Sequence, residues 1–325
     1  MGLQYTLRRV ATAIFTIVLI VLLNFLLFRA MPGSPERILL GRMPGVTPEI
    51  LQQTRERWGL DRPLFPDQFV AYVASTAQGD LGFSYSARGR PVTDVLLQRL
   101  GPTLLLFGLG EVFAIVMGLA LGAYSGWKRG GVVDYVGNGV SLVLYSTPYF
   151  LLGMGLLLVF ATGLGWFPTF GMSTAGATYA SLVDRLVDYG AHFVLPLATV
   201  ALGLIGQYAI LMRSSVIETL GEDYVTTARA MGFRDGRVLR HHALPNAMLP
   251  TVTLVAINLG YVVAGAITVE VVFNWPGLGT LTVDALSSRD YPVLQGVFLL
   301  LSVAVVFANL AADLIYGVLD PRVRT

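Results

Sequence analysis

The 325-residue sequence contains no cysteine, and this absence excludes disulfides, thiolate metal sites and cysteine nucleophiles together. Charged residues are also scarce: they make up 13% of the chain, about half the share found in a typical soluble domain. The net charge of +2 gives no support to nucleic-acid binding. An ordinary soluble enzyme is therefore excluded, and the hydrophobic content of 54% points to the lipid bilayer.

Lysine occurs only once, at Lys128, and this excludes the phosphate-binding loop of an ATPase. That loop needs G-x-x-x-x-G-K followed by serine or threonine, whereas Lys128 lies in "GWKRG". Any ATP hydrolysis must therefore come from a partner. Histidine is rare as well: His241 and His242 are adjacent and cannot share a helix face, and His192 is expected across the membrane from them. We expect no catalytic residues and no metal site.

Long runs without charge predict membrane-spanning helices, since a span needs about 20 mostly apolar residues. The first run follows Arg8 and Arg9 and leads into no small-residue cleavage site, so segment 10–29 is interpreted as an uncleaved anchor. The pattern predicts an all-α integral membrane protein with six transmembrane helices. They cover residues 10–28, 102–126, 135–161, 192–212, 247–269 and 291–312.

The distribution of basic residues predicts the orientation, because cytoplasmic loops are enriched in lysine and arginine. Segments 1–9, 127–134, 213–246 and 313–325 hold 11 of the 22 basic residues, whereas loops 162–191 and 270–290 hold only Arg185 and Arg289. Both termini, 1–9 and 313–325, are therefore predicted to be cytoplasmic. Asp313, near the inner end of the last span, is expected to pair with a nearby arginine.

Segment 30–100 differs from the rest, with 15 charged residues in 71. We interpret it as a small extracytoplasmic subdomain, with a helix that starts at the capping residue Thr47 and continues to Trp58. A disordered loop is the alternative, but Phe65, Phe69 and Tyr72 offer apolar surface to bury. The remaining 101–312 would form a five-helix core. No internal repeat is visible, whereas secondary transporters often show one.

The cytoplasmic loop 213–246 is the longest and most basic loop on its side of the membrane. Asp223 to Met231 predicts a two-turn helix with acidic residues at its start, and Gly232 stands where a helix stop is expected. A helix this short is marginal alone. We therefore expect it to dock on a partner, with Tyr224, Ala228 and Met231 on one face.

The same loop carries a resemblance. Thr226-Thr227-Ala228, three residues, Gly232, nine residues, His242, one residue and Leu244-Pro245 resemble the E-A-A, x3, G, x9, I-x-L-P loop of ABC importer permeases. The sequence departs from that pattern at Thr226, Thr227 and His242. Further motifs resemble the dipeptide, oligopeptide and nickel branch of the family. They are "WGLDRPL", "GDLGFSYS", "VEVVFNWPGLG", "RDYPVLQG" and "ADLIYGVLDPRVR".

The resemblance implies a type I ABC importer permease fold in a bacterial or archaeal inner membrane. It implies a homologous second permease subunit, two ATPase subunits that hold ATP and Mg, an extracytoplasmic solute-binding protein and membrane lipid as partners. The chain itself would bind no cofactor. The expected cargo is a di- or oligopeptide, with nickel, glutathione or another small solute as alternatives, and an ion-coupled secondary transporter as the rival class. The loop residues expected at the ATPase are Tyr224, Thr226, Thr227, Ala228, Met231 and Gly232.

Other polar residues in or near the spans are candidates for the translocation path. Glu111 lies deep in a span, where it could line the path or, alternatively, form a protonated or hydrogen-bonded contact between helices. Pro148 breaks its helix, so its neighbours could line a wet cavity or serve close helix packing. These neighbours are Tyr145, Ser146, Thr147 and Tyr149. For Glu270, Asn274 and Trp275 we consider an outer gate, a binding-protein contact or simple interfacial placement.

Overall fold

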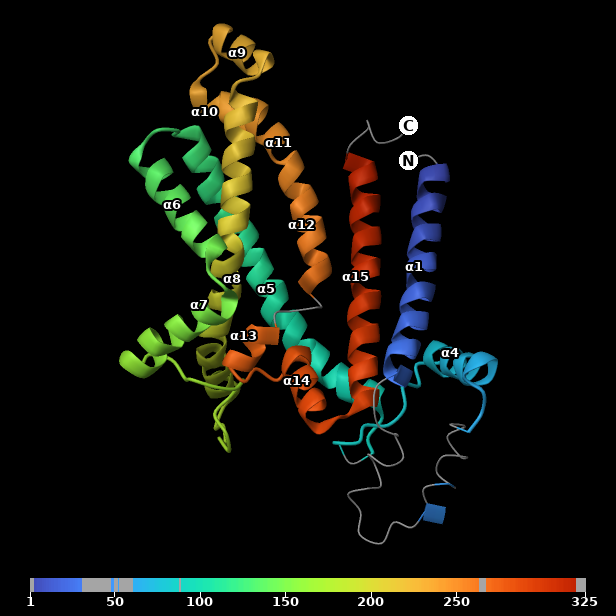
Figure 1. Cartoon of the computed structure of the whole chain (residues 1–325). Helices are drawn as coiled ribbons and strands as arrows, with labels where there is room; N and C mark the ends of the chain where they lie inside the picture. Colours follow the sequence, from blue (N-terminus) through green and yellow to red (C-terminus); the bar gives the residue numbers. More distant parts are fainter. Residues whose placement is uncertain are drawn as a thin grey trace.

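The computed structural model describes residues 3–30, 48, 49, 52, 61–87, 89–262 and 267–319. Most of these residues are helical, as expected for membrane spans, where no water is present to satisfy backbone groups outside a helix. The pairing of Phe83 with Pro91 is the one β-bridge within the described residues. The predicted all-α membrane class is therefore confirmed (Figure 1).

Four helices are long and apolar enough to cross a membrane, or five if one bent pair is counted as a span, within the part of the chain that the structure describes. The four are α1 (Leu3–Ala30), α5 (Val92–Trp127), α8 (Leu182–Leu220) and α15 (Tyr291–Leu319). Each contains one of the predicted spans and extends beyond it. The predicted fifth span is divided between α12 (Leu249–Val262) and α13 (Ile267–Val272), and the residues between them lie outside the described ranges.

The helix predicted over 135–161 is divided in two at Pro148, which was expected to break it. α6 (Val132–Ser146) ends, and α7 (Tyr149–Leu156) with its π-helical continuation η2 (Leu157–Gly163) departs at a bend of 107°. Pro148 lacks the backbone N–H that would continue α6, and Thr147 before it is extended with ψ 123°. The bend follows from this pair of residues.

Short helices complete the molecule. Two lie in the segment between the first two long helices: η1 (Leu64–Gln68) and α4 (Phe69–Ala77). Four follow α8 at the upper end of Figure 1: α9 (Asp223–Ala230), α10 (Asp235–Val238), η3 (Leu239–Ala243) and α11 (Leu244–Ala247). α14 (Leu278–Ser288) precedes α15 at the lower end.

α5 and α8 pack closely because α5 presents glycine toward α8. A Cβ atom built on Gly118 would lie 2.6 Å from the Cβ of Tyr208, and one on Gly126 would lie 2.9 Å from the Cβ of Val216. Gly110 and Gly122 meet α8 in the same way. Small residues let helix backbones approach in a membrane, where dispersion contacts replace the hydrophobic effect as the driving force.

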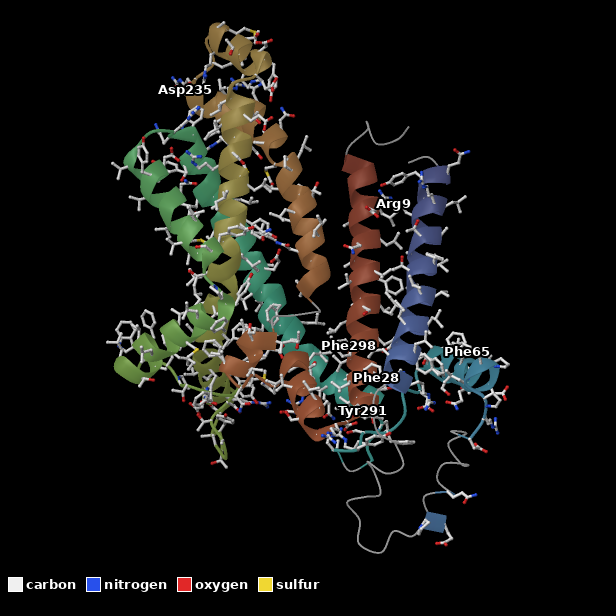
Figure 2. The ribbon with its side chains drawn as sticks, in the orientation of Figure 1. Arg9, Phe28, Phe65, Asp235, Tyr291 and Phe298 are labelled. Carbon is white, nitrogen blue, oxygen red and sulfur yellow. The ribbon has the colours of Figure 1, made fainter. Side chains whose placement is uncertain are left out.

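α1 packs on α15, and the contact runs the length of both helices (Figure 1). Arg9 Nη1 lies 2.9 Å from Asp313 Oδ2, so the prediction that Asp313 pairs with an arginine is confirmed. The rings of Phe28 and Phe298 meet at 6.0 Å nearer the other end (Figure 2). The start of α1 and the end of α15 lie toward the end of the molecule that carries α9.

The segment before α5 is folded against the helices where the structure describes it. Ser84 Oγ, Ser86 Oγ and Ser86 N donate hydrogen bonds of 2.6, 2.7 and 2.8 Å to one oxygen of the fully buried Asp290. This part of the segment is therefore a packed structure and not a disordered loop. Of the predicted helix from Thr47 to Trp58, the structure describes Pro48, Glu49 and Gln52, and all three are helical. The rest of that segment lies outside the described residues.

Candidate functional site

α9 is the element that projects farthest from the membrane helices, directly beyond the end of α8 (Figure 1). It begins at Asp223, as predicted, and the carbonyl of Glu222 accepts hydrogen bonds from Val225 N at 3.1 Å and Thr226 N at 3.2 Å. The acidic Glu222 and Asp223 suit the positive end of the helix dipole. α9 has only two turns, and the chain then runs back through α10, η3 and α11 to α12.

The end of α9 is a Schellman motif centred on Gly232. Gly232 N donates to Arg229 O at 2.9 Å, Phe233 N donates to Ala228 O at 3.4 Å, and Gly232 has φ +82°. The predicted glycine stop is confirmed, because the left-handed conformation at this position favours a residue without Cβ.

A small core holds the loop together. Val225 and Ala228 are buried with Val238 of α10, and Leu220 and Phe233 pack against them. Ala228 is 1% exposed, so the prediction that it shares an exposed docking face with Tyr224 and Met231 is wrong. Within this chain the small side chain of Ala228 permits close packing of α9 on α10 and is not available to a partner groove.

The outward surface of α9 consists of other predicted residues. Tyr224, Thr226, Thr227 and Met231 are exposed, Met231 at 64%. The Tyr224 hydroxyl accepts a hydrogen bond of 2.9 Å from Asn246 Nδ2, which links the start of α9 to α11. The His242 ring stacks on Phe233 with centroids 5.7 Å apart, so this histidine holds η3 against the end of the α9 loop.

Glu111 is 1% exposed and joins three helices. The Tyr208 hydroxyl of α8 donates a short hydrogen bond to Glu111 Oε1 and accepts one of 3.0 Å from Asn258 Nδ2 of α12. Asn258 Nδ2 also lies 3.4 Å from the side-chain oxygen of Gln207. Of the two hypotheses for Glu111, the geometry favours the hydrogen-bonded contact between helices.

The residues around the α6–α7 bend differ in exposure. Tyr145 and Ser146 are exposed, whereas Thr147 and Tyr149 are half-buried. Ser146 Oγ and Thr147 Oγ1 donate to the carbonyl of Val143 at 3.1 and 2.7 Å. The Tyr149 ring lies over Gly203 of α8, where an added Cβ would collide with it. Packing therefore accounts for Tyr149, while Tyr145 and Ser146 present polar groups on the surface of this chain.

Glu270 is fully buried, so its carboxylate is not available for direct contact with a binding protein in this conformation. Its carboxylate accepts hydrogen bonds from Thr103 Oγ1 at 2.7 Å, Gly279 N at 2.6 Å and Thr280 N at 3.2 Å. The last two donors are orphan N–H groups of the first turn of α14, which a carboxylate satisfies well.

Trp275 is also buried, at 1% exposure, and its indole N–H donates to the carbonyl of Pro102 at 3.0 Å. A contact of Trp275 with a binding protein is therefore excluded in this conformation, because the ring lies in the core. Asn274 beside it is exposed and has φ +47°. Thr103 and Asp290 could not be predicted as hydrogen-bond partners, because the side chains to which they hydrogen-bond lie 167 or more positions away in the chain.

Within the described residues, no group of three or more histidine, aspartate or glutamate side chains could hold a metal ion. His192 is buried near the start of α8, with Nδ1 2.8 Å from the carbonyl of Asp188. Long apolar helices, a buried polar contact between them and a folded element projecting from one end define a helical membrane protein with several spans.

The family models identify which one. Residues 118–325 match the binding-protein-dependent transport system inner membrane component, and residues 2–106 match the N-terminal part of the same component. The chain belongs to this family. It is thus an inner-membrane, multi-pass component of a binding-protein-dependent ABC transporter, which works with ATPase and binding-protein partners and is not itself an ATPase.

Relatives of full length support this assignment. A protein of Brucella suis biovar 1 (strain 1330), named as a peptide permease, is 39% identical over 99% of both chains. The glutathione transport system permease protein GsiC of Escherichia coli O6:H1 is 37% identical over 99% of both chains. A chain of the MetNI methionine ABC transporter, solved in an inward-facing conformation, matches with TM-score 0.54 and 20% identity, over 70% of this chain and 96% of that chain. The last likeness concerns the fold alone.

Proposed function

We propose that this chain is a permease subunit of an ATP-driven importer for di- or oligopeptides, with glutathione as the principal alternative cargo and nickel or another small solute as further ones. The names of the relatives support the cargo class, since they are peptide and glutathione permeases that match over nearly the whole chain. The observation that carries the ABC mechanism is the folded loop of α9, because it has its own core and still leaves Tyr224, Thr226, Thr227 and Met231 uncovered.

In this proposal, α9 docks on an ATPase subunit and α8 carries its displacement into the membrane. Support comes from the continuity of α8, which runs for 39 residues from the far end of the molecule to the start of the loop. Arg213 Nε lies 2.5 Å from Asp134 Oδ1, and this ion pair joins α8 to α6 at the same end. Since glycines seat α5 directly on α8, the three helices would move together in alternating access.

The proposed assembly contains a homologous second permease subunit, two ATPase subunits that bind ATP and Mg, and an extracytoplasmic solute-binding protein. In the proposed topology of the type I importer fold, six spans cross the membrane and both termini are cytoplasmic, with residues 30–100 outside and 101–312 as the permease core. Tyr145 and Ser146 are proposed to face the translocation path, and Asn274 the outer gate or the binding protein. Glu111 is proposed to hold α5, α8 and α12 together beside that path.

The proposal is tested by uptake into proteoliposomes. The permease, its partner subunits and its binding protein are reconstituted, and labelled dipeptide is supplied with or without ATP. We expect uptake only with ATP, no ATP hydrolysis by the purified chain alone, and competition by unlabelled peptide. Uptake that continues without ATP when an ion gradient is present would instead establish the ion-coupled class. Competition by glutathione but not by dipeptides would reassign the cargo.

A further inference from the structure

The segment before α5 contains an apolar helix that no transport role explains. α4 and the preceding η1 lie beside the end of α1 that is remote from α9 (Figure 1). From residue 68 to residue 79 the sequence has no charged side chain, while Asp67 and Asp80 stand at the two ends. Leu64 and Phe65 of η1 are 41% and 48% exposed. A short apolar helix outside the bundle core needs a covering environment.

One face of α4 is covered by α1. The Phe25 ring lies 5.3 Å from Phe69 and 5.4 Å from Tyr72, measured between centroids. Asn24 Nδ2 donates a hydrogen bond of 3.1 Å to the Tyr72 hydroxyl. Phe65 joins the same aromatic group, and Figure 2 shows it beside α4. These contacts fix the position of α4 relative to the end of the span.

The sides of α4 that α1 does not cover differ in polarity. At about 3.6 residues per turn, Val70, Val73 and Ala77 fall on one side, and Ser75 and Gln78 fall on the other. All five are exposed, Val70 at 59%. A helix with one apolar side and one uncharged polar side suits the boundary between lipid and water.

Arg29 marks the level of that boundary. Arg29 lies in the last turn of α1, and its guanidinium is 5.6 Å from the centre of the Phe25 ring. A charged group at the end of a span belongs at the headgroups, so the aromatic group that holds α4 lies at the same depth. Leu23, Leu26 and Leu27 of α1 are exposed as well, so the last turns of this helix still present apolar side chains that the described residues leave uncovered.

We propose that residues 64–77 form an interfacial anchor, with Leu64, Phe65, Val70 and Val73 inserted into the phospholipid leaflet remote from α9. α4 packs on the last turns of a helix that is long and apolar enough to cross the bilayer, close to Arg29 at the end of that helix, and this position identifies phospholipid as the occupant. The anchor fixes the depth of α1 and holds the segment that leads to Ser84 and Ser86 against the membrane surface. It acts independently of the cargo.

The absence of cysteine makes a clean test possible. Val70→Cys, Ala77→Cys and the control Ser75→Cys are each labelled with an environment-sensitive fluorophore in the assembled transporter, which is reconstituted in phosphatidylcholine vesicles. The vesicles carry a nitroxide at acyl carbon 5 or carbon 12. For a face buried about 5–10 Å into the interface, fluorophores at 70 and 77 are expected to be quenched about twofold more by the carbon-5 nitroxide than the one at 75. Iodide in the water should quench the control most.

Two outcomes would overturn the proposal. Equal iodide quenching at all three positions would mean that α4 lies in water. Resistance to both iodide and lipid nitroxides at Val70 and Ala77 would mean that a protein subunit covers this face. Quenching at positions 70 and 77 is measured in separate variants, so the failure of one to fold leaves the other as a test. Ala77 tolerates substitution because it is small, exposed and at the end of α4.

Discussion

Gly232 offers the sharpest test of the docking element, because a single backbone angle ends α9. Its φ is +82°, and a Cβ atom added there would meet no other atom within 4 Å. A substitution therefore acts through backbone conformation and not through a collision. The left-handed conformation costs a residue with Cβ about 1–2 kcal/mol, and a β-branched side chain tolerates it least.

The structure indicates why this cost should matter. α9 has only two turns, which are marginal in isolation, and the core beneath it contains just Val225, Ala228 and Val238 as buried residues. A loss of about 1–2 kcal/mol changes the ratio of folded to unfolded loop by a factor of about 5–30. If only the folded loop binds the ATPase, the apparent affinity of the permease for the ATPase decreases in proportion to the fraction of molecules with a folded loop.

The assay compares Gly232→Asn, Gly232→Ala and Gly232→Val with the control Gly236→Ala. Gly236 lies in α10, is exposed, has ordinary helical backbone and also has nothing within 4 Å of a built Cβ. ATPase affinity is measured by titration against the purified permease, and ATP-dependent uptake is measured in proteoliposomes. We expect the loss to increase from Asn to Ala to Val, with Gly236→Ala unchanged. Full affinity in Gly232→Val, or equal loss in the control, would refute the reasoning.

Three further predictions concern the exposed Met231, the buried Asp290 and the closely packed Gly118. Met231→Arg should weaken ATPase binding without lowering thermal stability, because Met231 is exposed and outside the loop core; unchanged binding would remove it from the interface. Asp290→Ala should speed proteolysis of the segment before α5, since unmade buried hydrogen bonds cost about 1–3 kcal/mol each, while the exposed Asp284→Ala should not. Gly118→Ala should cost about 1–3 kcal/mol by overpacking α5 on α8. Gly108→Ala is the control: its Cβ meets nothing within 4 Å and alanine favours the helix, so it should not lower the unfolding temperature.

Local features of the sequence predicted local structure well. Gaps between charges located α1, α5, α8 and α15, because the bilayer excludes charge over a fixed thickness. The start of α9 and its stop at Gly232 were also predictable, since both depend on backbone groups within a few residues.

The features that were not predicted depend on the direction of a helix after a break or on contacts between residues far apart in the chain. A gap between charges gives the length of an apolar stretch but not its direction, so a break at Pro148 was predicted but its bend of 107° was not. The buried contacts of Glu270 were not predicted, because its partner Thr103 lies 167 residues away in the chain. Ala228 was assigned to the outer face because helix periodicity identifies which residues share a face. Periodicity does not say which face is covered, and here Val238, from the next helix, covers the face that contains Ala228.

The pairing of α1 with α15 has a consequence for biosynthesis. Tyr5 donates a hydrogen bond to the carbonyl of Asp313, 308 residues later, so the first helix made finds its partner only when the last one emerges. At about 5–20 residues per second, the ribosome needs about 15 to 60 s to cover that distance. During this interval α1 lies in the bilayer without α15, with α4 already able to pack on its end, and its uninterrupted apolar length permits this. The polar ends at Arg9 and Asp313 then recognise each other after insertion, so the final helix closes the bundle around the first.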